Sequence, residues 1–397
     1  MSKTMNTILR YIGYILFRPI WWLERLIPRS KNIWIFGAWY GQKYSDNSKW
    51  FYEYVLENEP HLKAVWITKN KDVYKELCAR NKSVCMSSSL KGVLWCLRAK
   101  YAFLTSGVVD VNALALNGCK QIWLWHGMPL KKILNSESTY TSAKKKAFQR
   151  MLNPYYSFAP SFTLTSSDFF VPYLKEAFML PESKILKTGL PRCDAFFTRK
   201  KEKLITDLKT HFPNARFLLY MPTFRMSSQL NGLPFNPFVQ QFCFDEKEFV
   251  AFLEDCNIVF LYKPHFADSS VNVQINSTRF LCVTDGCFED LYVLLNSVDG
   301  LITDYSSVFF DFLATKKPVY LLPFDYEEYV NTSRSHFFNM YDEMHGMFCN
   351  NWKDFYKQLL KAQTISLLDR LEEDRIKFAT YLNGRSCESL FKILKQV

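Results

Sequence analysis

The sequence predicts an α/β protein with two doubly wound, Rossmann-like domains. Short apolar runs alternate with helix-like stretches in two separate series, one between Asn32 and Leu190 and one between Arg216 and Phe324. Strands that alternate with helices form parallel sheets, so two such series imply two sheets. A length of 397 residues fits two domains of ordinary size.

Each series divides into short runs that we interpret as strands. In the first series they are residues 32–37, 63–68, 101–106, 121–127, 162–167 and 185–190. In the second series they are residues 216–224, 258–266, 279–285, 300–306 and 318–324. The lysine-rich stretch 197–215 is typical of a linker followed by a helix, and the tail 366–397 is typical of helices with a break at Asn383-Gly384. We therefore expect domains at 31–200 and 201–397.

The N-terminal stretch 5–31 is apolar and aromatic, but Arg10, Arg18 and Arg25 interrupt it. No unbroken apolar span reaches the roughly 18 residues that a transmembrane helix needs. Tryptophan, tyrosine and arginine together favour an amphipathic helix that lies on a membrane surface, over residues 1–30. The alternative is an aromatic helix that packs on its own domain.

Composition limits the partners and the kind of site. A net charge of +12 indicates a polyanion: nucleic acid, an anionic membrane or a phosphate-rich substrate. No nucleic-acid-binding motif is present, so we do not expect nucleic acid. The 13 glycines form neither common phosphate-loop motif, and the 11 cysteines include no C-x-x-C pair. This cysteine pattern favours reduced thiols in a cytoplasmic protein.

Residues that can do chemistry follow several predicted strands. His126 ends a strand of the first series, and His265 ends one of the second. Thr223 and Arg225 follow a further strand. In open α/β sheets ligands bind at the carboxyl ends of strands, so a cleft between the domains would let both histidines face one ligand.

The stretch "DGLITDYSSVFFDFLATKKPVYLLPFD", residues 299–325, is typical of a βαβ unit whose turn is unusually polar. Ser306 or Ser307 suits a helix N-cap, and the start of a helix attracts phosphate through unpaired N–H groups and the helix dipole. The alternative is that Asp304 and the two serines only cap the helix.

With these motifs assembled, the chain resembles the CDP-glycerol glycerophosphotransferase family of teichoic acid and capsule synthesis. The matching segments are "WHGMPLKK", "GLPRCD", "YMPTFR", "KPH" and "ITDYSSVFFDFLATKKPVYLLPFD". The resemblance implies a GT-B-type fold with two domains facing a cleft, chemistry without a metal or other cofactor, and peripheral attachment to the cytoplasmic face of the cell membrane.

The resemblance also implies roles for the matching residues. His126 matches a histidine proposed as general base, and His265 matches one close to the donor's diphosphate. The substrate-binding matches are Thr223, Arg225, Lys263, Asp304, Ser306, Ser307, Arg192 and Arg334. Cys193 replaces the family's usual Asn, and Ser335 replaces the glycine after Arg334. These departures leave the donor alcohol and the acceptor open.

The expected reaction is attack by a hydroxyl of a lipid-linked acceptor or growing polymer on the β-phosphorus of CDP-glycerol, with release of CMP. No D-x-D triplet occurs, so we expect His265 as imidazolium, Arg225 and the serines to neutralise the phosphates. The alternatives are transfer from CDP-ribitol, a nucleotide-sugar glycosyltransferase, and a non-catalytic binder of polyanions.

Basic residues gather downstream of His126. They are Lys131, Lys132, Lys144, Lys145, Lys146 and Arg150. We interpret them as a patch that binds anionic lipid or the polyphosphate product. The alternative is a solvated helix face.

Overall fold

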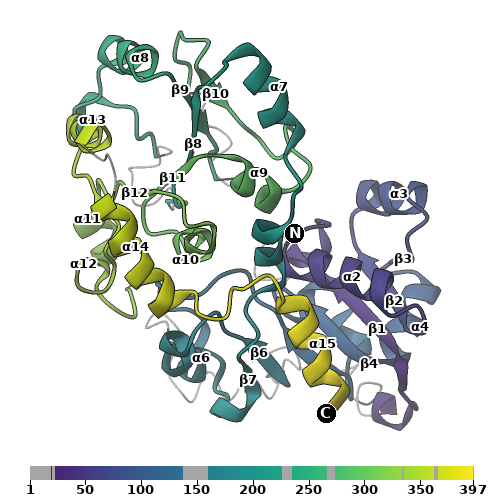
Figure 1. The fold of residues 1–397 in the computed structure, drawn as a ribbon. Coiled ribbons are helices and arrows are strands. Elements are labelled where there is room, and N and C mark those ends of the chain that lie inside the picture. The colour runs from purple at the N-terminus through teal and green to yellow at the C-terminus, as the bar shows by residue number, and fades with distance from the viewer. Residues whose placement is uncertain are drawn as a thin grey trace, which may run out of the picture.

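The computed structural model confirms the α/β class and shows two parallel sheets (Figure 1). It describes Pro19 and residues 23–136, 160–225, 235–265, 273–332, 335–361 and 365–396. The predicted domain boundaries stay a prediction.

The first sheet has seven strands in the order β3-β2-β1-β4-β5-β6-β7. Every pair is parallel. The strands are β1 (Ser30–Gly37), β2 (Lys63–Thr68), β3 (Val84–Met86), β4 (Ala99–Leu104), β5 (Lys120–Trp123), β6 (Phe162–Leu164) and β7 (Ile185–Leu186). Strand order reverses between β1 and β4, which makes the loops after these strands a natural binding position.

The second sheet has six parallel strands in the order β10-β9-β8-β11-β12-β13. They are β8 (Arg216–Met221), β9 (Ile258–Tyr262), β10 (Phe280–Cys282), β11 (Gly300–Thr303), β12 (Val319–Leu321) and β13 (Met347–Phe348). Its order reverses between β8 and β11. All five residues of β9 and all four of β11 are buried, which explains their continuous apolar sequences.

Helices cover both sheets (Figure 1). In the first half they are α2 (Asp46–Asn58), α3 (Lys71–Ala79), α4 (Leu90–Arg98) and α6 (Val171–Phe178). In the second half they are α7 (Lys203–His211), α8 (Glu246–Asp255), α9 (Leu291–Ser297), α10 (Val308–Phe312), α11 (Tyr326–Thr332), α12 (Met340–Glu343) and α13 (Trp352–Lys361). The chain ends with α14 (Ile365–Phe378) and α15 (Ser386–Gln396).

The C-terminal tail returns to the first half of the molecule. Figure 1 shows α14 and α15, in yellow, leading from the second sheet to the first. The backbone N–H of Tyr381 donates to the carbonyl of Ser166, and the Asp194 carboxylate accepts from the first two N–H groups of α15. The predicted break at Asn383-Gly384 lies between the helices, and Gly384 adopts a φ of +80° there. The tail, predicted with the second domain, thus packs on the first sheet.

The predicted N-terminal amphipathic helix lies mostly outside the described residues. Its described end, the short helix Glu24–Leu26, is tied to the first half because the Glu24 carboxylate accepts from the Asn117 N–H at 3.2 Å. Within the part of the chain that the structure describes, every helix is too short or too polar to cross a bilayer.

Candidate active site

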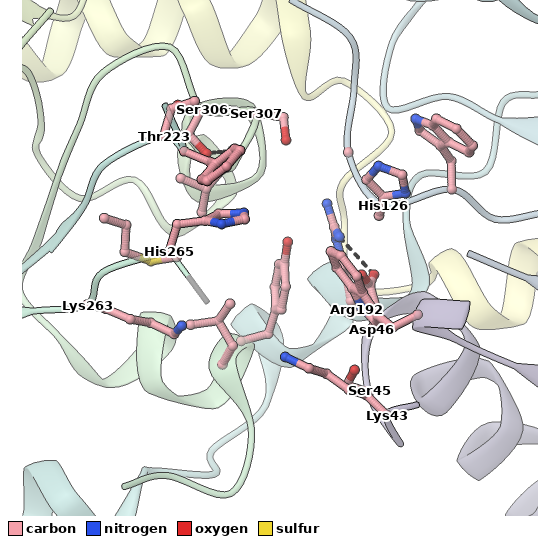
Figure 2. Close-up of a pocket in the computed structure, with 18 of the residues that line it drawn as sticks. Lys43, Ser45, Asp46, His126, Arg192, Thr223, Lys263, His265, Ser306 and Ser307 are labelled. Carbon is pink, nitrogen blue, oxygen red and sulfur yellow. Dashed lines mark hydrogen bonds and ion pairs between the residues drawn. The ribbon is translucent and has the colours of Figure 1, made fainter. Parts of the chain in front are cut away.

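A cavity of about 810 Å³ lies between the two sheets at the carboxyl ends of their strands. The loops after β1 and β5 form the wall on the first-sheet side, and the loops after β8, β9 and β11 form the opposite wall. These loops flank the points where strand order reverses, as expected for doubly wound sheets. Figure 2 shows His126 and Arg192 across the cavity from His265, Ser306 and Ser307.

His126 belongs to the loop that follows β5, three residues after the strand ends. Its Nδ1 lies 3.1 Å from the carbonyl oxygen of Thr105. A carbonyl only accepts, so Nδ1 carries the proton and Nε2 of the neutral ring is the basic atom. The ring stacks on Trp125 with centroids 4.3 Å apart, and Trp125 has a φ of 57°, which turns the chain out of the strand.

Gly127 brings the histidine loop against the second half. Its φ is +151°, and a Cβ built there would lie 2.2 Å from Ser307 Oγ and 2.8 Å from Ser307 Cβ. Only glycine permits this approach at this backbone conformation. His126, the general-base candidate, therefore directly precedes the residue that contacts Ser307.

Ser306 and Ser307 do little helix capping, so capping alone does not account for these two hydroxyls. Ser307 makes no side-chain cap hydrogen bond, and Ser306 Oγ accepts from the Val308 N–H at a long 3.4 Å. Both line the cavity with Thr223 and Lys263. The Lys263 Nζ lies 2.9 Å from an Asp285 oxygen. This wall thus presents hydroxyls and an ammonium that suit phosphate oxygens.

His265 also lines the cavity, but the expected imidazolium is corrected. Burial lowers the pKa of His265 to about 4, and the nearby positive charges of Lys263, Lys131 and Lys43 add to this effect. The ring is therefore neutral at pH 7 in the ligand-free protein. Negative charge from a bound phosphate would raise its pKa.

Arg225 and Asp304 lie behind the wall, which corrects their predicted role in direct binding. Asp304 is fully buried and accepts from the Thr223 N–H at 2.9 Å and the Tyr305 N–H at 2.6 Å. The Arg225 guanidinium lies 2.8 Å from Asp304 and forms a two-pronged pair with Asp325 at 2.8 and 2.7 Å. These residues fix the loops after β8 and β11 relative to each other.

Arg192 lines the cavity, but its guanidinium forms ion pairs with carboxylates of the protein. One end of its guanidinium lies 2.7 Å from Asp46 of α2, and the other lies 2.6 Å from Asp311 of α10. Burial disfavours the charged form, yet the two carboxylates hold the pKa of Arg192 well above its ordinary value. Arg192 therefore joins the two halves beside the site, in place of the predicted substrate contact.

The predicted basic patch is only partly within the described residues. Lys144, Lys145, Lys146 and Arg150 lie outside them, as does the substrate-binding candidate Arg334. Lys131 points into the cavity, with Nζ 3.5 Å from Thr223 Oγ1, instead of lying on an outer face. The backbone N–H of Lys132 donates to the Ser335 carbonyl at 2.8 Å.

Sequence reasoning missed an ion cluster at the cavity. Asp285 contacts Lys43 at 2.5 Å and Lys263 at 2.9 Å, so it connects the two walls. Burial opposes its charge, but the hydrogen bonds from both lysines lower the pKa of Asp285 to about 2. Asp285 ends a predicted strand, so the rule that found His265 also marks this residue.

Among the described residues, no group of three or more His, Cys, Asp or Glu side chains is arranged to hold a metal ion.

Comparison with known proteins identifies relatives across nearly the whole chain. The profile of the "CDP-Glycerol:Poly(glycerophosphate) glycerophosphotransferase" family matches residues 21–396. The teichoic acid glycerol-phosphate transferase of Staphylococcus aureus is 25% identical over 397 residues, covering 96% of this chain and 93% of that protein. The teichoic acid poly(glycerol phosphate) polymerase of Staphylococcus epidermidis is 24% identical over 89% of this chain, which spans 49% of that longer protein.

The solved structure of the wall teichoic acid polymerase TagF has a similar fold. It superposes with a TM-score of 0.75 at 21% identity, covering 100% of this chain and 98% of that chain.

Proposed function

The chain belongs to the CDP-glycerol:poly(glycerophosphate) glycerophosphotransferase family, as the motifs predicted, and we propose that it transfers glycerol phosphate from CDP-glycerol to an acceptor hydroxyl. The acceptor is a lipid-linked molecule or polymer of teichoic acid or capsule synthesis, and CMP leaves. The family description names this donor, and the relatives in S. aureus and S. epidermidis are named for glycerol phosphate. We further propose that the two sheets form a GT-B-type pair of domains.

One observation supports this proposal most strongly. Gly127, the residue after His126 in the first half, lies against Ser307 of the second half, so that a Cβ at Gly127 would lie 2.2 Å from the serine oxygen. A base for the acceptor hydroxyl and hydroxyls for the donor phosphates thus share one cavity, which is the arrangement that an in-line displacement at phosphorus requires.

The residues divide the work as follows. Ser306, Ser307, Thr223 and Lys263 hold the diphosphate oxygens, and His265 contributes as bound phosphate raises its pKa. The acceptor oxygen attacks the β-phosphorus, the bond from that phosphorus to the bridging oxygen breaks, and CMP departs. His126 Nε2 takes the proton of the attacking hydroxyl.

The test is release of CMP by the purified full chain from CDP-glycerol, with CDP-ribitol and a set of nucleotide sugars in parallel. A lipid carrying a terminal hydroxyl serves as acceptor, and EDTA is present in one arm. We expect CMP from CDP-glycerol in both arms. Turnover of CDP-ribitol alone would indicate that the group transferred is ribitol phosphate. Turnover of a nucleotide sugar alone would contradict the proposal.

We also propose peripheral association with the cytoplasmic face of the membrane. The apolar and aromatic stretch before Glu24 supports this, as do the basic residues that follow His126. Sedimentation with anionic vesicles tests it: binding that is lost at 1 M salt indicates the basic residues, and binding that persists indicates the aromatic stretch. Absence of binding to vesicles at low salt would contradict the proposal.

A further inference from the structure

Lys131 belongs to the loop that carries His126, but its side chain contacts the opposite half of the molecule. Its Nζ donates to Thr223 Oγ1 at 3.5 Å and lies 5.4 Å from the centre of the Tyr329 ring. Thr223 follows β8 and Tyr329 belongs to α11, and both residues line the cavity. The first half thus places an ammonium on the wall to which we assign the donor phosphates.

Main-chain hydrogen bonds fix the backbone at Lys131. This residue forms an antiparallel bridge with His336, and the N–H groups of Lys132 and Phe337 donate to carbonyls across the bridge at 2.8 Å each. Earlier in the same loop, Gly127 also lies against the second half. A side chain that starts from an anchored backbone loses less conformational freedom when it binds a ligand.

The charge of Lys131 acts on two histidines beside it. Burial is the largest cause of the lowered pKa of His265 and of His336, and the positive charge of Lys131 lowers both further. His265 lines the cavity on the same wall as Thr223. The ammonium of Lys131 is therefore within electrostatic reach of the place where the donor phosphates would bind.

The donor diphosphate needs more positive charge than the other proposed ligands supply. Three of these ligands are neutral hydroxyls, and His265 is neutral at pH 7 before a phosphate binds. Lys263 and Lys43 share the carboxylate of Asp285, at 2.9 and 2.5 Å, which offsets part of their charge. Both phosphates of the donor are ionised at pH 7. The phosphate of CMP has a second pKa of about 6 and so gains negative charge when it leaves.

We propose that Lys131 binds the donor diphosphate and neutralises the negative charge that CMP gains as it leaves. This inference rests on the proposed function and adds a catalytic residue to it. The acceptor oxygen forms the new bond to the β-phosphorus, and the bond from that phosphorus to the bridging oxygen breaks. The electron pair of the broken bond stays with CMP, and the hydroxyl proton passes to His126. The Lys131 ammonium keeps its protons and pairs with the departing phosphate.

The test replaces Lys131 with methionine in the full chain, which removes the charge and keeps a long side chain. Calorimetry measures the binding of CDP-glycerol, CMP and cytidine without acceptor, with saturation-transfer NMR for weak ligands. We expect Lys131→Met to raise the dissociation constants of CDP-glycerol and CMP about 10- to 100-fold, the loss typical of a hydrogen bond to a charged group. Cytidine has no phosphate and should bind as it does to wild type.

Steady-state CMP release from CDP-glycerol gives the effect of the same variant on catalysis. We expect kcat to fall about a hundredfold, as it does when one group that stabilises transition-state charge is removed. Lys131→Arg keeps the charge and should recover part of the lost rate and CMP affinity.

Lys247→Met is the matched control, because it removes the same charge from an exposed lysine of α8 outside the cavity lining. It should keep the wild-type rate and affinities. Thermal melting of all three variants checks that the fold persists.

Three results would overturn the role of Lys131. One is a Lys131→Met variant that binds CMP as tightly as Lys247→Met does. Another is an equal loss of cytidine and CMP affinity, which would indicate a distorted cavity. The third is unchanged donor and CMP affinity with a raised acceptor KM, which would assign the ammonium to an acceptor phosphate.

The wild-type chain separates these failures from failure of the proposed function. A wild-type chain that neither binds CDP-glycerol nor releases CMP from it contradicts the function itself. A wild-type chain that releases CMP, together with any of the three results above, contradicts only the role of Lys131.

Discussion

At the scale of single residues, the site depends on how closely Gly127 lets two separate loops approach. His126 precedes this glycine, and Ser307 occupies the space in which any side chain at position 127 would lie. His126, the proposed base, and Ser307, a proposed phosphate ligand, follow strands of different sheets, so the Gly127–Ser307 contact limits how closely their loops approach. A misplacement of about 1 Å between reacting groups can lower the rate of a group transfer by about a hundredfold.

Gly127→Ala should lower kcat by about a hundredfold, because its Cβ forces the His126 loop away from Ser307. Steady-state CMP release measures the loss, and thermal melting checks that the fold persists. Gly286→Ala is the matched control, since a Cβ there meets nothing within 4 Å. Equal activity in the two variants would contradict the importance of the contact.

Sequence patterns identified several polar residues that line the cavity, among them His126, His265, Ser306 and Ser307. They failed for Arg225, Asp304 and Arg192, because a motif does not reveal which way a charged side chain points. Each of these three is at most 3% exposed and is satisfied by protein partners. Motif matching cannot separate a residue that binds a ligand from one that holds the binding loop in place.

At the scale of elements, a short segment from the second half pairs with the loop that contains His126. His336 bridges to Lys131 in antiparallel fashion, and the Phe337 N–H donates to the Leu130 carbonyl at 2.8 Å. The strands on either side were predictable from alternating apolar runs. The pairing of His336 with Lys131 was not predictable, because it depends on how the two halves pack and leaves no periodic pattern in the sequence.

His336 makes the stability of the protein depend on pH at this contact between the two halves. Neither ring nitrogen has a hydrogen-bond partner among the described residues, and the ring lies 5.6 to 6.1 Å from those of Tyr305, Tyr326 and Tyr329. Burial lowers the pKa of His336 to about 4, with a further contribution from Lys131. The unfolded chain therefore binds a proton below pH 6.5 that the folded chain does not bind until pH 4, so this residue destabilises the fold as pH falls through that window.

His336→Phe should remove this loss of stability at low pH. Relative to wild type, the variant should gain about 2 kcal/mol more free energy of unfolding at pH 5 than at pH 7.5. Urea unfolding at the two pH values gives the difference. A gain that is the same at both values would show that His336 is not held neutral in the folded protein.

At the scale of the whole molecule, the C-terminal helix joins the two halves. α15 follows the second sheet in sequence but packs on the first, where Phe391 lies 5.6 Å from Trp34 and 6.2 Å from Tyr54. Two parallel sheets could be read from the sequence. Which half the C-terminal helix packs on could not be predicted, since an amphipathic helix fits an apolar surface on either half.

Phe391→Ala should destabilise the protein by about 3–5 kcal/mol, because the ring is only 4% exposed and its removal leaves a cavity under α15. Urea unfolding measures the effect. Ile376→Ala, at a residue of α14 that is 60% exposed, should change stability by less than about 0.5 kcal/mol. A loss in Phe391→Ala no larger than that of this control would show that α15 contributes little to the packing of the first half.

We propose that His126 acts on the acceptor while the opposite wall binds the donor. The most direct measurement compares wild type with His126→Gln, following CMP release in a single turnover and CDP-glycerol affinity by calorimetry. We expect His126→Gln to lower the rate by a factor of about 10² to 10⁴ and to leave the dissociation constant for the donor unchanged. A variant that keeps the wild-type rate, or one that loses donor affinity in proportion to the rate, would contradict it.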